Sequence, residues 1–165
     1  MDHGQGPAGP GWLVALETSG LGEALRQSVW VYPLVEVLHI LGLALLVGAV
    51  AAFDLRLLGV GCRLPASPLS RLLLPVAATG LALTVPTGTL LFISEATALA
   101  ANPAFLAKMA LLVLALANIA LFHHGAGRTI AAWDGRPPPM ARVAGAVSLA
   151  LWVGVLALGR LIAYL

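Results

Sequence analysis

Four long apolar stretches dominate the chain, and polar or charged residues separate them. A bilayer core about 30 Å thick is crossed by about 20 apolar residues in a helix. Each stretch is close to that length, so we expect four membrane-spanning helices, at residues 29–53, 72–93, 105–122 and 143–165. Because the connections are short, consecutive helices should run in opposite directions. The predicted fold is an all-α integral membrane protein, an up-and-down bundle of four transmembrane helices.

The region before the first span has a different pattern and forms a separate predicted unit. Residues 1–28 make up this unit, and the four-helix transmembrane domain covers 29–165. Within 11–28, apolar residues alternate with charged ones at helical spacing, which is typical of an amphipathic helix lying in the membrane interface. The sequence Thr18 to Gly20 should break this helix.

The composition agrees with a membrane protein and excludes several functions. Hydrophobic residues make up 60% of the chain and charged ones only 10%, whereas a soluble domain carries about 25% charged residues. The expected partner is therefore the lipid bilayer. The nine basic residues are scattered along the chain and form no phosphate-binding stripe, which excludes nucleic acid. No hydrolase or phosphate-loop motif is present, and a single cysteine excludes an internal disulfide.

The distribution of arginine predicts the orientation of the bundle. Loops that hold an excess of lysine and arginine face the cytoplasm. The basic residues cluster in the connections between spans 1 and 2 and between spans 3 and 4, at Arg56, Arg63, Arg71, Arg128, Arg136 and Arg142. The segment before span 1 has Arg26 alone, and the connection between spans 2 and 3 has none. Both termini should then lie outside.

Ionisable residues inside the spans are the strongest functional signal. Such groups are costly in hydrocarbon, so they normally face the bundle interior and have partners. In the alternating topology, five of them fall at one level in the outer half: Glu36, His39, Glu95, Lys108 and Arg160. Glu36 and His39 share one face of the first helix because they are three residues apart. We expect these groups to meet in one pocket.

This pocket has two interpretations. In the first, Glu36 pairs with Lys108 or Arg160 and only locks the helices together, with His39 as a hydrogen-bonded core residue. In the second, it is a cofactor or proton site with His39 as the ligand.

Two further groups also leave alternatives open. Thr84, Thr87 and Gly88 in the second span would serve close helix packing or leave room for a flat macrocycle. His123, at the cytoplasmic end of the third span, is a weaker metal-ligand candidate or an interfacial polar cap. It differs from His39 in depth by roughly 14 Å at 1.5 Å per residue, so the two are not expected to ligate one haem.

The sequence also resembles known membrane proteins. The run from Trp30 to Gly42, WVYPLVEVLHILG, followed by Asp54 to Gly59, DLRLLG, resembles an uncharacterised family of bacterial four-helix inner-membrane proteins. More distantly, the layout is similar to the CopD-like and HemJ-type membrane proteins. The matching positions are His39, Arg56, Pro75 to Gly88, Lys108 and His123.

This resemblance implies a function and a cellular location. HemJ-type proteins are haem-containing protoporphyrinogen oxidases in which the helix 1 histidine and the helix 3 lysine matter, and CopD-like proteins are linked to copper import. Copper favours soft methionine or cysteine ligands, and this chain has only three methionines and one cysteine. The expected protein is therefore a small haem b-type redox protein of the bacterial inner membrane, a candidate membrane oxidoreductase.

Each site residue receives a role under this hypothesis. His39 would be an axial ligand of the haem iron, in a site also lined by Thr84, Thr87 and Gly88. Lys108 and Arg160 would neutralise propionates or an anionic substrate. Glu36 would orient groups or relay protons, and the catalytic candidates are Glu36, Lys108 and Arg160. Electrons would be exchanged with a membrane redox partner or a quinone.

Two other functions stay open. The protein could be a non-enzymatic structural or accessory subunit, in which the charged groups form a static ion network. It could also be a small metal or solute transporter, with a polar path lined by Asn118 and the Thr79–Thr89 stripe. Small residues on the first helix would serve packing within the chain or a homo-oligomer contact; they are Gly42, Gly48, Ala49 and Ala52.

Overall fold

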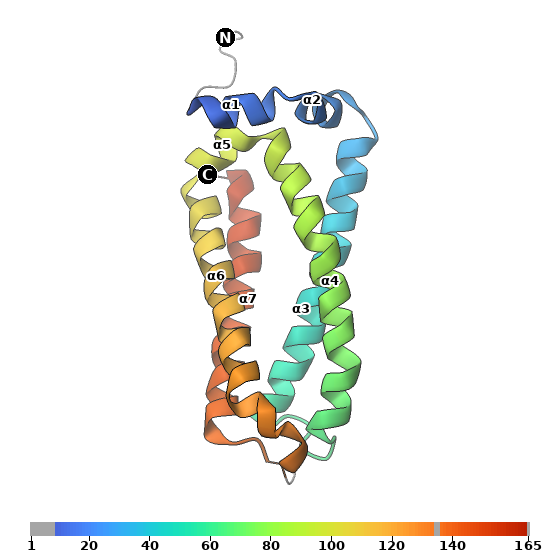
Figure 1. The fold of residues 1–165 in the computed structure, drawn as a ribbon, viewed down its shortest axis with the longest axis vertical. Coiled ribbons are helices and arrows are strands. Elements are labelled where there is room, and N and C mark those ends of the chain that lie inside the picture. The colour runs from blue at the N-terminus through green and yellow to red at the C-terminus, as the bar shows by residue number, and fades with distance from the viewer. Residues whose placement is uncertain (1–8, 134–135, 165) are drawn as a thin grey trace.

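Four long helices form the body of the protein. The computed structural model describes residues 9–133 and 136–164, and these are helical or irregular with no strand. The long helices are α3 (Val31–Leu58), α4 (Ala66–Ser94), α6 (Pro103–His124) and α7 (Pro139–Leu161). They run alternately up and down as a bundle, as Figure 1 shows. The predicted all-α, four-helix architecture is therefore confirmed.

All four helices are long and apolar enough to cross a membrane. Large apolar side chains are exposed along each of them, for example Val37, Val85, Val113 and Val153, which are all more than half exposed. A soluble protein rarely leaves such a continuous apolar surface in water. The four helices therefore indicate a multi-pass membrane protein.

The first helix extends beyond the apolar limit that the sequence predicts. α3 continues past residue 53 and includes Asp54 and Arg56, which are only 3% and 2% exposed. Neighbouring segments cover both side chains. The polar residues are therefore accommodated within the helix, and the helix does not end at them. The helix ends instead at Gly59, whose φ of 104° is a left-handed conformation that glycine adopts without strain.

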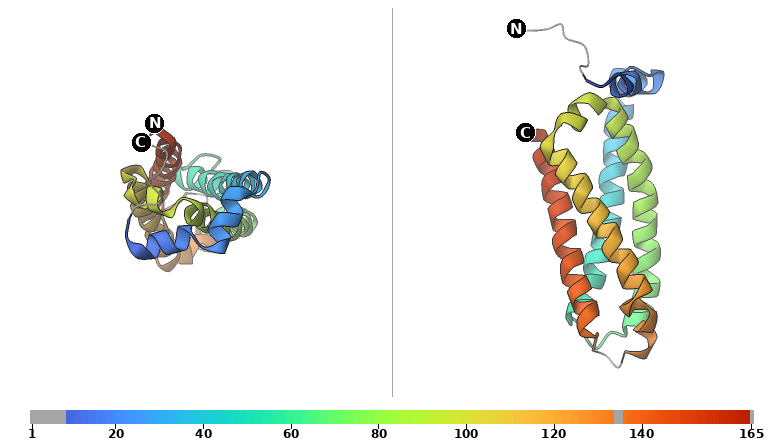
Figure 2. Two further views of the ribbon diagram at one scale, coloured as in Figure 1. Left: turned by 90° about the horizontal axis from the view of Figure 1, so that it is seen from above. Right: turned by 60° about the vertical axis from the view of Figure 1, so that its left-hand side comes forward.

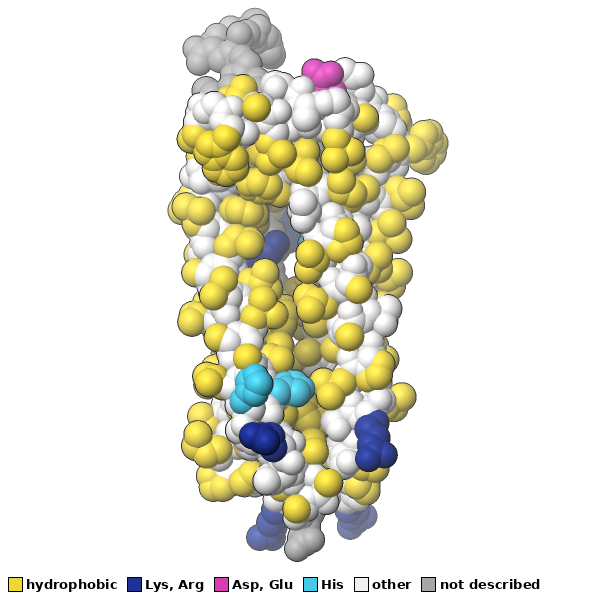
Figure 3. All heavy atoms as spheres, viewed as in Figure 1, with side chains coloured by type: hydrophobic (Ala, Val, Ile, Leu, Met, Phe, Trp, Pro, Cys, Tyr) yellow, Lys and Arg dark blue, Asp and Glu magenta, His cyan; other side chains and the backbone are white. Residues whose placement is uncertain are grey.

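The bundle is tightest where α3 crosses α4. Gly42 and Gly80 face each other there: a Cβ atom built on Gly42 would lie 2.5 Å from Thr84 Oγ1 and 3.0 Å from the Gly80 carbonyl oxygen. Small residues at a crossing let two membrane helices approach closely. By contrast, α4 and α6 are not packed closely against each other. We call the hollow between them, on the face shown in Figure 3, the groove between α4 and α6.

Three short helices cover one end of the bundle, which we call the capped end. They are α1 (Gly11–Glu17), α2 (Gly20–Gln27) and α5 (Ala96–Ala101). Figure 2 shows α1 and α2 lying across the ends of the long helices. The predicted break occurs at Thr18 and Ser19, where the Ser19 hydroxyl caps α2 by accepting a hydrogen bond from Gly22 N–H.

The opposite end is rich in arginine, and we call it the arginine-rich end. Basic side chains gather there on the face shown in Figure 3. Between α6 and α7 at this end lies a 3₁₀ helix, η1 (Ala126–Ala132).

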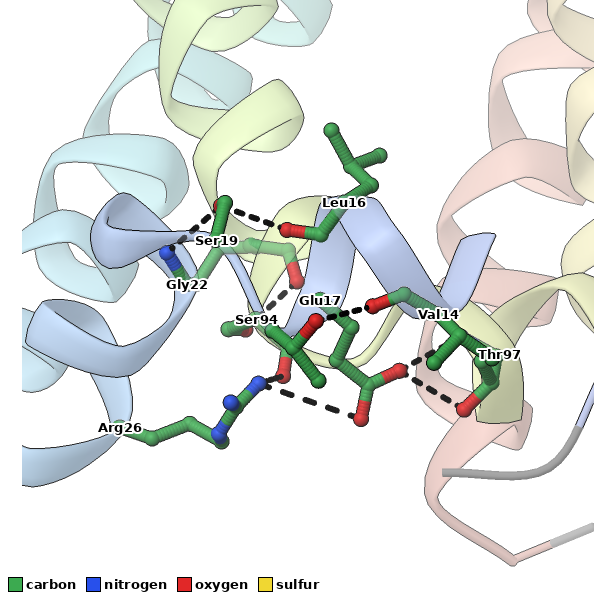
Figure 4. Close-up of polar contacts among 10 residues, drawn as sticks. Val14, Leu16, Glu17, Ser19, Gly22, Arg26, Ser94 and Thr97 are labelled. Carbon is green, nitrogen blue, oxygen red and sulfur yellow. Dashed lines mark hydrogen bonds and ion pairs between the residues drawn. The ribbon is translucent and has the colours of Figure 1, made fainter. Parts of the chain in front are cut away.

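A partly buried carboxylate attaches the cap to the bundle. Glu17 Oε2 accepts hydrogen bonds from the backbone N–H of Thr97 at 2.8 Å and from its hydroxyl at 2.7 Å. Arg26 lies 3.9 Å from Glu17 Oε1 and donates to the Ser94 carbonyl at 3.0 Å. Figure 4 shows these contacts joining α1 and α2 to the α4–α5 junction. Partial burial alone would raise the pKa of Glu17, but the two Thr97 hydrogen bonds and Arg26 together hold that pKa below its usual value.

We expect the docking of α1 to weaken in acid. The pKa of Glu17 is lowered in the folded state. The stabilisation that its ionised carboxylate gives to the docked α1 is therefore complete above the pKa of an unrestrained glutamate, and it is lost as pH falls through the lowered pKa. Hydrogen exchange of the α1 amides, corrected for the intrinsic effect of pH, should therefore accelerate on acidification. In Glu17→Gln the exchange should be faster at neutral pH and nearly independent of pH. Equal pH profiles for the two proteins would contradict this prediction.

Candidate functional site

His39 is held by α4 in a defined orientation. Its ring is half-buried, and Nδ1 lies 3.2 Å from the Thr84 carbonyl oxygen and 3.1 Å from Thr87 Oγ1. The Thr87 hydroxyl itself donates to the Leu83 carbonyl at 2.6 Å, so its oxygen is left as an acceptor. Both neighbours of Nδ1 are then acceptors, which assigns the ring proton to Nδ1. The lone pair of the neutral imidazole is consequently on Nε2.

The threonines and glycine predicted to line a cofactor site lie against this histidine. A Cβ atom on Gly88 would be 2.9 Å from His39 Cε1, so the glycine makes space for the ring itself. Thr87 is buried and Thr84 half-buried, and the Thr84 hydroxyl oxygen has no hydrogen-bond partner within the described part of the chain. These residues position His39, and direct contact between them and a cofactor stays a prediction.

Lys108 is the second polar group that faces inward. It is half-buried on α6, and its Nζ would lie 3.7 Å from a Cβ atom on Gly159 of α7. The residue count along α6 predicts that it lies at about the level of His39. Figure 3 shows the hollow between the helix pairs, with a basic side chain inside its upper part. Among residues 9–133 and 136–164 we find no hydrogen bond or ion pair of Lys108, which is unusual for a cation at membrane depth.

The other charged residues do not join this pair, which corrects the prediction of one shared pocket. Glu36, Glu95 and Arg160 are all exposed. Glu36 is three residues from His39, hence about 60° away around the helix, and α4 covers only the histidine side. Arg160 is satisfied near its own helix end, where it donates to the Tyr164 hydroxyl at 2.6 Å and lies 4.9 Å from the ring centre.

His123 lies in the other half of the bundle. It is exposed near the end of α6, its Nδ1 is 2.8 Å from the Ile119 carbonyl oxygen, and its ring meets Phe122 edge-on. A buried apolar cluster lies between the levels of His39 and His123, formed by Leu46, Ala49, Ala77, Ala115, Trp152 and Val155. Within the described residues, no three His, Cys, Asp or Glu side chains come together as a metal site.

The structure also contains a cavity that the sequence analysis missed. It has a volume of about 200 Å³, lies among the four long helices towards the arginine-rich end, and is almost wholly apolar. Its polar lining consists of Asp54, Asn118, His123 and Ser148. The only sequence signal was the run of residues 54–59 within the resemblance, which we interpreted as a helix-end motif.

Comparison with known proteins assigns this chain to no family. No protein-family model, no curated protein and no solved structure matches this chain.

Proposed function

We propose that this protein is a small membrane redox protein that binds haem b in the groove between α4 and α6, where His39 Nε2 would be a ligand of the iron. The observation that carries the proposal is the fixed orientation of His39. A metal-ligating histidine almost always donates its other ring N–H to a carbonyl or carboxylate, which fixes the tautomer. Thr84 and Thr87 provide those acceptors, at 3.2 and 3.1 Å from Nδ1. The histidine therefore fits the group.

Lys108 supplies the second part of the fit. Haem b carries two propionate carboxylates, and a half-buried lysine without a carboxylate partner among the described residues would form a charge-assisted hydrogen bond with one of them. When bound, the haem would supply one-electron chemistry. The exposed Glu36 and Arg160 could act only from the rim of the groove, Glu36 by exchanging protons with the interface.

The proposed setting is a bacterial inner membrane, with the arginine-rich end in the cytoplasm and both termini outside. The cap formed by α1, α2 and α5 would then lie at the outer interface. Electrons would pass to or from a quinone or another membrane redox protein.

The two alternative functions have less support. A static ion network needs a carboxylate beside Lys108, and within the described chain none is found there. Transport needs a polar path, but an apolar cluster that includes Leu46 and Trp152 separates the two halves. Thr79 and Thr89 are exposed and donate to carbonyls of their own helix, at 2.9 Å each, so they line no such path.

The interaction of Lys108 with a haem propionate can be distinguished from the apolar contacts of the haem. We expect protein expressed with ample haem and purified in mild detergent to show a Soret band. Lys108→Met should bind haem about 10-fold more weakly, because a hydrogen bond to a charged group contributes about 1.5 kcal/mol or more. The same substitution should not change the affinity for haem dimethyl ester, which has no propionate charge. Affinities would be measured by absorbance titration.

An exposed arginine at the opposite end provides the control for this experiment. Arg71→Met removes one cation far from His39 and should leave both affinities unchanged. A protein that shows no Soret band despite ample haem would overturn the proposed function.

A further inference from the structure

The cavity near the arginine-rich end has the size of a small aromatic molecule. Its volume is about 200 Å³, and an apolar cavity of about 150 Å³ in a protein interior is known to bind benzene. Phe53 and Phe122 lie in its wall with their ring centres 5.9 Å apart, in edge-on contact. Rings of this kind favour an aromatic guest.

One wall group in this cavity requires a hydrogen-bond donor. Asp54 is 3% exposed, and within the described residues its Oδ2 has no hydrogen-bond partner. Ser148 lines the cavity together with Asp54. The Asn118 amide is engaged already, since its Nδ2 donates to the Ala144 carbonyl at 3.0 Å. A buried acceptor without a partner is costly, so a guest that donates a hydrogen bond to Oδ2 would be favoured.

The cavity is reached through the apolar surface of α4. Ala78 and Leu74 line it and are also exposed, so its mouth opens on the side of a helix that is long and apolar enough to lie in a membrane. A guest arriving through such a mouth must dissolve in lipid. A charged amine would lose its hydration on the way at high cost, whereas a neutral hydroxyl loses much less.

We propose that this cavity binds a lipid-soluble single-ring phenol, whose hydroxyl group donates a hydrogen bond to Asp54 Oδ2. The site is separate from His39 and Lys108, and the proposal does not depend on haem binding. The aromatic ring fills the apolar volume beside Phe53 and Phe122, and the carboxyl group selects the hydroxyl.

The test uses p-cresol and its methyl ether, p-methylanisole, in which a methyl group replaces the hydroxyl hydrogen and so removes the donor. Binding to the protein in lipid nanodiscs would be measured by saturation-transfer NMR and calorimetry, relative to empty nanodiscs. We expect p-cresol to bind about 10-fold more tightly than the ether, as one hydrogen bond to a carboxylate implies. Asp54→Leu should remove this difference. Equal affinities of the two compounds for the unmodified protein would overturn the proposal.

A variant at the mouth tests the location without changing the buried carboxyl group. Ala78→Phe should block entry and reduce p-cresol binding at least about 10-fold, because its ring would fill the opening. Ala82→Phe adds the same ring one turn away on the exposed surface of α4, outside the cavity lining, and should bind p-cresol normally. Normal p-cresol binding in Ala78→Phe would refute the site. The Soret band of Ala78→Phe should be unchanged, so this result is independent of the haem proposal.

Discussion

Replacing His39 with alanine should abolish the haem spectrum of the protein while leaving the bundle folded. Within the described residues, the ring is hydrogen-bonded to α4 through Nδ1, at 3.2 Å from Thr84 O and 3.1 Å from Thr87 Oγ1. Losing these two hydrogen bonds should lower the free energy of unfolding only slightly, whereas losing a ligand of the iron should lower the haem affinity strongly. Substitution of a residue that only supports a metal ligand typically reduces metal affinity 10- to 100-fold. Removal of the ligand itself should therefore cost at least about 100-fold, measured as Soret absorbance per protein.

Three further measurements test whether the Soret band is lost because His39 no longer ligates the iron. His123→Ala should keep its Soret band, because His123 lies in the other half of the bundle beyond the apolar cluster. Thr87→Val should lower haem affinity by about 10-fold, since it removes one acceptor that orients the ring. Added imidazole should restore the spectrum of His39→Gly. Full haem retention in His39→Ala would exclude His39 as the ligand.

The helices could be predicted from the sequence because a membrane span is a local property. About 20 consecutive apolar residues are enough to predict a span whatever surrounds them. The helix limits could not be predicted in the same way. Asp54 and Arg56 look like the polar end of a span, yet they are buried by neighbouring segments and lie inside α3. The sequence of one segment does not show whether other parts of the chain will bury its residues.

The candidate site could be predicted only in part, for a related reason. Depth along a helix follows from counting residues, so the sequence predicts a shared level for His39 and Lys108. Rotation about the helix axis depends on which neighbour covers each face, and this left Glu36 exposed beside a half-buried His39. The cavity near Asp54 depends on side chains from four helices together. No pattern within one helix indicates such a volume.

The second large effect is expected where α3 crosses α4. In Gly80→Ala the new methyl group would overlap the backbone nitrogen of Leu46 and would lie 2.7 Å from the Gly42 carbonyl oxygen and 2.9 Å from Leu46 Cα. All three are backbone atoms, so only a shift of the whole helix can relieve the contact. Overpacking of this kind costs about 1–3 kcal/mol, and we expect the upper end of that range in the free energy of unfolding.

Gly48→Ala is the matched control because it adds the same methyl group to the same helix pair. A Cβ atom on Gly48 meets nothing within 4 Å. Alanine favours the helix over glycine by about 1 kcal/mol, so this variant should be as stable as the original protein or slightly more so. Steric trapping in mild detergent would measure both free energies of unfolding. Because Thr84 and Thr87 reach His39 across the same crossing, Gly80→Ala should weaken haem binding as well, whereas Gly48→Ala should not. Equal stabilities of the two variants would mean that α3 and α4 are farther apart than the structure shows.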